Sequence, residues 1–149
     1  MGLFQSFDIC ASGMSAERLR MDTIAQNIAN VNTTRTENGT PYTRKSVIFE
    51  EKQLNPVTFN DTLEYAKKFK GNGVRVSSVY DDKSTDYIME YDPSHPDADA
   101  DGYVARPNVN TVTEMTNLID ASRAYEANVT AFNAVKSMAQ AGISIGTSS

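Results

Sequence analysis

The stretch TVTEMTNLIDASRAYEANVTAFNAVKSMAQAGISI, residues 111–145, decides the fold because it predicts one long amphipathic helix. Apolar and aromatic side chains recur there at alternating steps of three and four residues, which places them on one face of a helix. This face forms a seam along the helix, and its apolar and aromatic members are Met115, Leu118, Tyr125, Val129, Phe132, Ala139 and Ile143. The two remaining positions of the seam hold Ser122 and Lys136. Such a seam is typical of a helix that packs on another helix in a coiled coil.

Local signals predict the ends of this helix. Thr111 and Glu114 have the spacing of a capping box, whose two side chains satisfy backbone amides of the first turn, so the helix is expected to begin near Thr111. Gly142 is expected to end it, because glycine is common just past the last turn of a helix. Residues 146–149 are expected to form a flexible tail.

A second amphipathic helix is expected near the start of the chain, over residues 3–30. At 1.5 Å per residue it would be about 42 Å long. Its apolar side chains again fall at steps of three and four: Leu3, Phe4, Phe7, Ala11, Met14, Met21, Ile24, Ala25 and Ile28. Two long stripes at opposite ends of a chain indicate a subunit that completes its fold by packing on copies or neighbours.

The middle of the chain has a different pattern. Short alternating runs of apolar residues predict three strands, at residues 42–49, 73–80 and 87–91. Residues 53–72 are expected to form a loop, with a short helical turn near 63–66.

The expected fold is mainly α with a small β region. Long N- and C-terminal helices are expected to form a coiled-coil-like hairpin, with a loop and β-hairpin insertion between them. The domains expected are the N-terminal helix with an asparagine-rich signature (1–34), the polar loop and β-hairpin region (35–110), and the C-terminal helix and tail (111–149).

Charge and composition exclude several classes of partner. The chain has 149 residues and a formal net charge of −5, with 14 basic and 19 acidic side chains. No basic stripe is present that would release counterions from phosphates, so we expect no nucleic-acid partner. Neither a signal-peptide pattern nor an apolar run of about 18 residues is visible, so we expect no cleaved signal and no membrane insertion.

Candidate catalytic or metal-ligating residues are few. The segment DADADG, residues 97–102, matches the first half of a calcium loop, but the twelfth position is Asn108 instead of glutamate. We interpret it as an acidic turn. His95 and Cys10 are the single histidine and cysteine, and neither has neighbours that predict a base, nucleophile or metal site. We therefore expect no enzymatic activity, no catalytic residue, no metal and no cofactor.

Three asparagines, Asn27, Asn30 and Asn32, lie where the first helix is expected to end. Their side chains can donate and accept hydrogen bonds, so they could cap the helix and begin a loop. They could equally form an amide cluster that fixes the register between neighbouring subunits, as a polar residue does in a coiled-coil seam. The residues alone leave both interpretations open.

Several blocks of this sequence resemble the rod and hook subunits of the bacterial flagellum, the flagellar axial protein family. The block QNIANVNT at 26–33 is similar to the family's N-terminal signature. Blocks similar to its C-terminal signature are GYVARPNVN at 102–110, EMTNLI at 114–119 and ASRAYEAN at 121–128. The helix around FNAVK, residues 132–136, and the short length are most similar to subunits of the proximal rod.

This resemblance implies a structural subunit that is exported without a cleaved signal by the flagellar type III apparatus. It would polymerise in the periplasm into a shaft that transmits torque and encloses the export channel. The implied partners are copies of the chain, other proximal rod subunits, the distal rod protein and the basal-body protein that joins the rod to the export gate. Two alternatives remain open. The chain could be a different proximal rod subunit from the one that its length and last helix resemble most, or it could be a secreted helical binding module with an acidic cation-binding loop.

The expected assembly interface combines the two apolar stripes with the asparagine signature. Its members are Leu3, Phe4, Phe7, Met14, Met21, Ile24, Asn27, Ile28, Asn30, Asn32, Thr33, Met115, Leu118, Ile119, Ser122, Tyr125, Asn128, Val129, Phe132, Val135 and Ala139.

Overall fold

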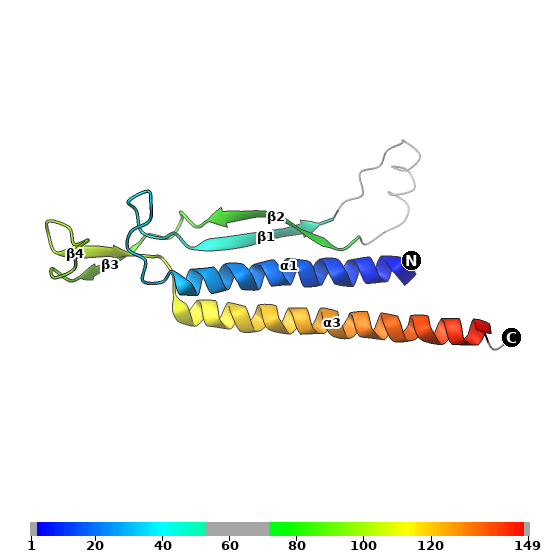
Figure 1. Ribbon diagram of the computed structural model, residues 1–149. Coiled ribbons are helices and arrows are strands. Elements are labelled where there is room, and N and C mark those ends of the chain that lie inside the picture. The colour runs from blue at the N-terminus through cyan, green and yellow to red at the C-terminus, as the bar shows by residue number, and fades with distance from the viewer. Residues whose placement is uncertain (1–2, 53–71, 148–149) are drawn as a thin grey trace, which may run out of the picture. The chain divides into compact units, whose positions relative to one another are not determined.

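A computed structural model describes residues 3–52 and 72–147 of the chain (Figure 1). Its elements, in order, are α1 (Leu3–Ala29), β1 (Lys45–Glu51), β2 (Val74–Asp81), β3 (Ile88–Tyr91), β4 (Tyr103–Arg106) and α3 (Thr111–Thr147). The described part is thus mainly helical with a small β region, as the sequence predicted. The helical turn expected near 63–66 lies outside the described residues.

Helix α1 ends one residue earlier than expected. Both the backbone amide and the side-chain amide of Asn30 donate to the carbonyl of Gln26, at 3.1 and 2.9 Å. The amide of Val31 then bonds to the carbonyl of Ile28, three residues back, which tightens the last turn. Asn30 therefore closes this helix end, as the capping interpretation predicted for it.

Helix α3 begins at Thr111 as predicted, but the predicted capping box is wrong. The capping residue is Asn110, whose Oδ1 accepts from the amides of Val112 and Thr113 at 3.0 and 3.1 Å. An asparagine oxygen reaches these free amides as well as a threonine hydroxyl does. Glu114 is consequently available for contacts elsewhere in the fold.

The predicted end of α3 at Gly142 is also wrong, because the helix continues to Thr147 and includes Gly146. A glycine inside a helix costs about 1 kcal/mol relative to alanine, which weakens a helix without terminating it. Of the tail expected at 146–149, residues 148–149 lie outside the described part of the chain.

Two small antiparallel sheets lie between the helices in sequence. Sheet β1–β2 is closed at one end by Asp82 donating to Arg44 and at the other by Lys52 donating to Gly73, at 2.7 and 2.9 Å. Both strands were predicted to within a few residues. Seven residues of β1 face eight of β2 between these bonds, which indicates a β-bulge in β2.

The second sheet pairs β3 with β4. Strand β3 was predicted, whereas β4 was not, because its four residues follow an acidic turn and give too short an alternation. The turn closes through Gly102, which has φ +82° and accepts from the amide of Asp92. The register pairs Ile88 with Arg106, Met89 with Ala105, Glu90 with Val104, and Tyr91 with Tyr103.

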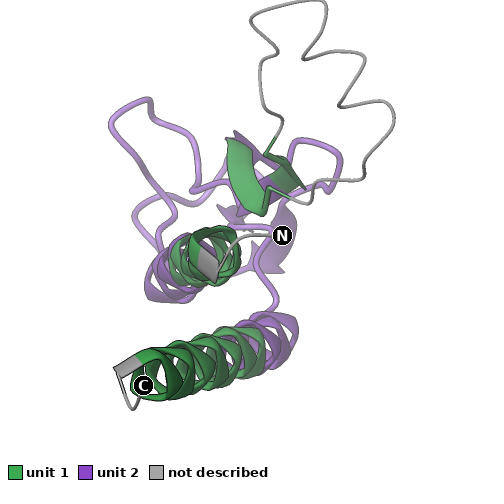
Figure 2. Cartoon of the chain, turned by 90° about the vertical axis from the view of Figure 1, so that its right-hand side faces the viewer, with its two compact units in different colours: residues 1–18, 49–77, 123–149 green, residues 19–48, 78–122 purple. Residues whose placement is uncertain are grey.

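The chain divides into two compact units, coloured separately in Figure 2. Unit 1 comprises residues 1–18, 49–77 and 123–149. Within it, the first part of α1 lies beside the last part of α3, with Cys10 and Ala16 buried. Gly13 permits this close approach, because a Cβ there would lie 2.8 Å from Oδ1 of Asn128.

Unit 2 comprises residues 19–48 and 78–122. It contains the last part of α1, the first part of α3 and both strands of the β3–β4 sheet. Its buried apolar side chains come from several segments and are Ile24, Tyr42, Val104, Val109 and Ala121. Buried among them are polar side chains, of which Asn27 and Glu114 have the smallest exposed area.

Candidate assembly surface and polar junction

Asn27 is the centre of a buried hydrogen-bond network in unit 2. Its side-chain nitrogen donates to the carbonyl of Lys45 at 2.8 Å and to Oε2 of Glu114 at 2.9 Å. Its oxygen accepts from the amide of Lys45 and from the hydroxyl of Tyr42, both at 2.9 Å. The last turn of α1 is thereby tied to the start of β1 and to α3.

Glu114 is a buried carboxylate that pairs with the guanidinium of Arg44 and accepts a hydrogen bond from Asn27. Its Oε1 accepts from Nε of Arg44 at 2.9 Å and lies 2.8 Å from Nη2 of the same guanidinium. The side chain of Arg44 is 25 % exposed and that of Glu114 only 1 %. Since an uncompensated buried carboxylate is strongly destabilising, Arg44 and Asn27 are what allow Glu114 to lie here.

Asn108 extends the network to the loop after β2. Its Oδ1 accepts from the amide of Arg44 at 2.8 Å, and its nitrogen donates to the carbonyls of Asp82 and Thr85 at 2.8 and 3.0 Å. Hydrogen bonds from the hydroxyl and amide of Ser84 lower the pKa of Asp82 below its ordinary 3.8. We call Asn27, Tyr42, Arg44, Asn108 and Glu114 together the polar junction.

The environment of Tyr42 affects its acidity. Burial raises the pKa of its hydroxyl above the ordinary 10.0, and the nearby negative charges of Asp81 and Glu114 raise it further. The protonated hydroxyl is the form that donates to Asn27, so the junction requires the neutral phenol.

The rest of the asparagine signature also makes contacts inside unit 2. Thr33 donates its hydroxyl to Oδ1 of Asn30 at 3.2 Å, and Arg106 donates to Oδ1 of Asn32 at 3.2 Å. Thr34 donates to the carboxylate of Asp97 at 2.8 Å. These bonds connect the loop after α1 to the β3–β4 sheet and its turn.

In the acidic turn, residues 97–102, the carboxylates of Asp97 and Asp99 accept hydrogen bonds from within the chain. Asp97 accepts from Thr34 and lies 3.6 Å from the guanidinium of Arg35, while Asp99 accepts the amide of Ala100. Within residues 3–52 and 72–147, no three His, Cys, Asp or Glu side chains come together as a metal site. His95 accepts the amide of Asp97 at Nδ1, and Cys10 is buried in unit 1.

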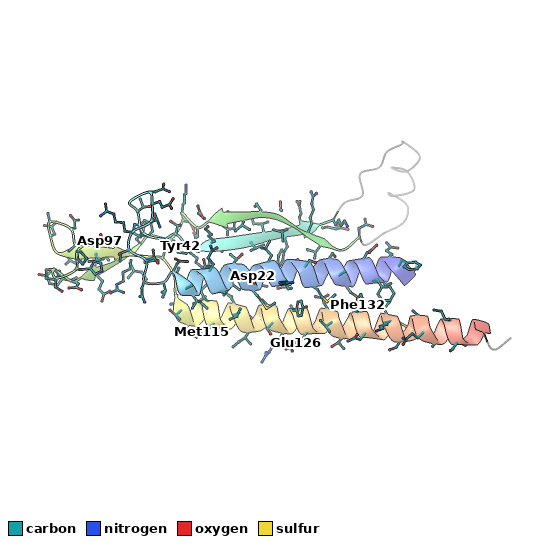
Figure 3. The ribbon with its side chains drawn as sticks, viewed as in Figure 1. Asp22, Tyr42, Asp97, Met115, Glu126 and Phe132 are labelled. Atoms are coloured by element: carbon teal, nitrogen blue, oxygen red, sulfur yellow. The ribbon has the colours of Figure 1, made fainter. Side chains whose placement is uncertain are left out.

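The predicted interface residues of unit 2 fall into two groups. Met115 (labelled in Figure 3), Ile119 and Asn32 are exposed, Met115 and Ile119 at 52 and 53 %. Val112, one turn before Met115 and 75 % exposed, extends this apolar face of α3 and was missed because it lies outside the seam. Buried or half-buried are Met21, Ile24, Asn27, Ile28, Asn30, Thr33, Leu118 and Ser122.

In unit 1 most of the predicted interface residues are half-buried. Phe4 is the exception, at 81 % exposure, and the side chain of Leu3 lies outside the described residues. The rings of Phe7 and Phe132 meet edge to face. The half-buried members are Phe7, Met14, Tyr125, Asn128, Val129, Phe132, Val135 and Ala139. The structure describes one copy of the chain, so their role in assembly stays a prediction.

No helix of the described residues is long and apolar enough to cross a membrane.

The chain has two long helices that carry exposed apolar side chains, and the polar junction connects the end of the first to the start of the second. These features define a class of helical structural subunit. Family models identify that class. Residues 7–35 match the family described as "Flagella basal body rod protein", and residues 100–145 match "Flagellar basal body rod FlgEFG protein C-terminal".

Individual relatives narrow the assignment. A protein of Borreliella burgdorferi named flagellar basal-body rod protein FlgC is 47 % identical over 150 residues, covering 97 % of this chain and 98 % of the relative. Proteins of the same name are 42 % identical in Bacillus subtilis and 36 % identical in Salmonella typhimurium, each alignment covering 98 % of this chain and 99 % of the relative. The chain belongs to the FlgC family of flagellar basal-body rod proteins, which are structural proteins.

Proposed function

We propose that this chain is a structural subunit of the proximal part of the flagellar rod, which joins its neighbours through the outer faces of α1 and α3. The observation that carries this proposal is the apolar face of Val112, Met115 and Ile119. These side chains are more than half exposed in the single chain, and all three lie within the match to the rod family's C-terminal model, residues 100–145. Complete burial of a fully exposed side chain of this kind contributes about 1.5–3 kcal/mol, and these three, half to three-quarters exposed, would gain a corresponding part of it.

The seam of α3 supports coiled-coil-like packing of the two helices in the assembled rod. In unit 1 its members Tyr125, Val129, Phe132 and Ala139 are half-buried and Ile143 is 67 % exposed, so each has area left for a neighbouring subunit. In this proposal residues 1–34 and 111–149 form the helical layer of the rod, and residues 35–110 form the region attached to it. Of the interface residues predicted from the sequence, the exposed and half-buried ones would line that helical layer, whereas Ile24 and Asn27 are buried within the chain.

The partners proposed are copies of the chain, other proximal rod subunits, the distal rod protein and the basal-body protein that joins the rod to the export gate. The chain would reach them through the flagellar type III apparatus without a cleaved signal and assemble in the periplasm. A stiff tube of packed helices would transmit torque and enclose a channel for later export substrates. These steps rest on family membership and on the exposed helical faces.

Deletion of the gene, followed by complementation, tests this function. The wild-type chain is expected to restore motility. Leu118→Asp and Phe132→Asp are expected to block rod assembly while leaving export intact, because each places a charge in a packed apolar seam. Asn38→Asp is the control, since Asn38 lies in an exposed turn outside both helices.

The measurements are swimming in soft agar, the yield of basal bodies with complete rods, and the amount of each variant exported. Normal motility with either seam variant would contradict the proposed interface. Normal motility of the deletion strain itself would contradict the proposed function.

A further inference from the structure

We propose that, in the assembled rod, the exposed face of the β3–β4 sheet binds residues 65–70 of a second copy of this chain. Met89, Tyr91 and Tyr103 define this sheet face. The inference rests on the proposed function, because it names one contact by which copies of a rod subunit would join.

The register of the sheet places these three side chains together. Side chains alternate between the two faces of a strand, and residues that pair directly across a ladder share a face. Val104 pairs with Glu90 and is only 2 % exposed, so their face is turned into unit 2. Met89, Tyr91 and Tyr103 lie on the opposite face and are 55, 66 and 44 % exposed.

The two tyrosines of the sheet face form an aromatic pair. Their rings pack edge to face, with centroids 5.3 Å apart and planes at 66°. A Cβ added at Gly102 would lie 2.9 Å from Cε2 of Tyr91, so the turn packs closely against that ring. A two-stranded sheet is only marginally stable unless an apolar face is covered, and an exposed apolar patch often marks an interaction site. We therefore expect a neighbour to cover this face.

The sequence around the sheet face is strongly acidic. Residues 81–101 contain eight acidic side chains and one basic side chain. Some of these carboxylates are paired within unit 2, as Asp97 is with Arg35. Asp99 and Asp101 are exposed in the turn between β3 and β4. A segment that binds here should therefore combine aromatic side chains with positive charge.

The chain carries such a segment in its own sequence. Residues 65–70 read YAKKFK and supply two aromatic side chains and three lysines. No other six consecutive residues of the sequence contain three basic side chains. The segment lies outside the described part of the chain, and its composition is what indicates the contact. Lysine carries its charge at the end of a flexible stem, so it can pair with a carboxylate while the aromatic side chains cover the sheet face.

The basic segment and the sheet face follow opposite ends of the β1–β2 sheet in the chain. Residues 53–71 join the end that the bond from Lys52 to Gly73 closes, and β3 follows the end that the bond from Asp82 to Arg44 closes. The seven residues of β1 between these bonds extend about 23 Å. Two unlike surfaces that follow opposite ends suit a head-to-tail contact. Contacts of this kind repeat from copy to copy and build helical polymers when they do not close, as a rod requires.

The test reverses the charge of each surface in the full-length chain, in a strain that lacks the wild-type gene. The lysine variant carries Lys67→Glu, Lys68→Glu and Lys70→Glu. The aspartate variant carries Asp99→Lys and Asp101→Lys. Each variant alone is expected to lower the yield of basal bodies with complete rods at least about tenfold, because like charges then meet at the contact.

Production of both variants in the same cell distinguishes a contact between copies from a contact within one chain. When the two variants alternate, the glutamates of one copy meet the lysines of the next, and the following contact joins two native surfaces. The yield of complete rods is then expected to rise at least about fivefold above that of either variant alone. Glu37→Lys reverses an exposed carboxylate in the loop after α1 and is the control, which should leave the yield unchanged.

Normal rods with either variant alone, or no recovery in the mixed strain, would overturn the inference. Recovery only when all five substitutions are in one chain would assign the contact to a single chain and would also overturn it. A folding defect cannot produce recovery in the mixed strain, since one misfolded chain does not repair another. The proposed function is tested separately, because complete rods in the deletion strain would contradict that function, whereas rescue by the wild type without any effect of the charge reversals would contradict this inference alone.

Discussion

The rings of Phe7 on α1 and Phe132 on α3 pack edge to face in unit 1, with centroids 4.9 Å apart and planes at 64°. This geometry places the positive edge of one ring on the negative face of the other, which contributes about 0.5–1.5 kcal/mol beyond the buried area. Among the described residues of unit 1, the buried apolar side chains are Cys10 and Ala16, so this pair contributes substantially to holding its two helical segments together.

Phe132→Ala is therefore expected to destabilise the free subunit by about 2 kcal/mol, less than for a fully buried phenylalanine because the ring is half-buried. Denaturant unfolding followed by circular dichroism measures the change. The matched control is Phe4→Ala on the same face of α1, where the ring is 81 % exposed. It is expected to change the free energy of unfolding by no more than about 0.5 kcal/mol. Equal effects of the two substitutions would contradict this account of unit 1.

Gly73 is expected to be intolerant of alanine for two separate reasons. Its φ of +90° disfavours any L side chain, and a Cβ would collide with Oγ of Ser12 and lie 3.3 Å from Cα of Ile9. The same Ser12 hydroxyl accepts the amide of Val74, so the collision also disturbs the start of β2. Gly73→Ala should cost about 2–3 kcal/mol of stability.

Gly39→Ala separates these two causes. Gly39 also has a left-handed φ, +76°, but nothing lies within 4 Å of a Cβ added there. Its substitution should cost only about 1 kcal/mol, the backbone part of the effect. Thermal unfolding of both variants gives the comparison, and a loss at Gly39 as large as that at Gly73 would show that the contact with Ser12 contributes nothing.

The two helices could be predicted from sequence because their signal is local. Each long apolar stripe repeats every three to four residues, and that period alone distinguishes a helix from its surroundings. Strands β1, β2 and β3 were found for the same reason, from alternation within a few residues. The start of α3 at Thr111 was also correct, although the residue that caps it was not.

The polar junction could not be predicted in this way. Asn27 and Glu114 are 87 residues apart in sequence, and neither stretch contains a sign of the other. Glu114 matched a capping box, which is a local motif, but Asn110 satisfied the first amides of α3 and left Glu114 to make tertiary bonds. The asparagine signature was recognised as unusual, yet its partners become visible only when the chain is folded.

Gly142 in α3 offers a stabilising substitution. Nothing lies within 4 Å of a Cβ added at this exposed helical position, so Gly142→Ala should gain the full difference in helix propensity, about 1 kcal/mol. Gly13→Ala is the comparison, because a Cβ there would meet Asn128 at 2.8 Å and the gain would be reduced or reversed. Far-ultraviolet circular dichroism and denaturant unfolding of the free subunit measure both. A gain at Gly13 equal to that at Gly142 would contradict the close approach of the helices in unit 1.

Alkaline pH should weaken the polar junction through Tyr42. Since its pKa is raised above 10.0 by burial and by the charges of Asp81 and Glu114, the folded chain keeps a proton that the unfolded chain loses. The stability that this group contributes is fully present below pH 10.0 and is lost as pH rises through the higher pKa of the folded state. The free energy of unfolding of the wild type should therefore fall relative to that of Tyr42→Phe as the pH rises above 10.0. Urea unfolding across this range, with the phenolate absorbance recorded in the folded protein, measures the difference. Parallel pH profiles for the two proteins would mean that Tyr42 ionises as easily in the folded chain as in the unfolded one, and that its bond to Asn27 does not hold the phenol protonated.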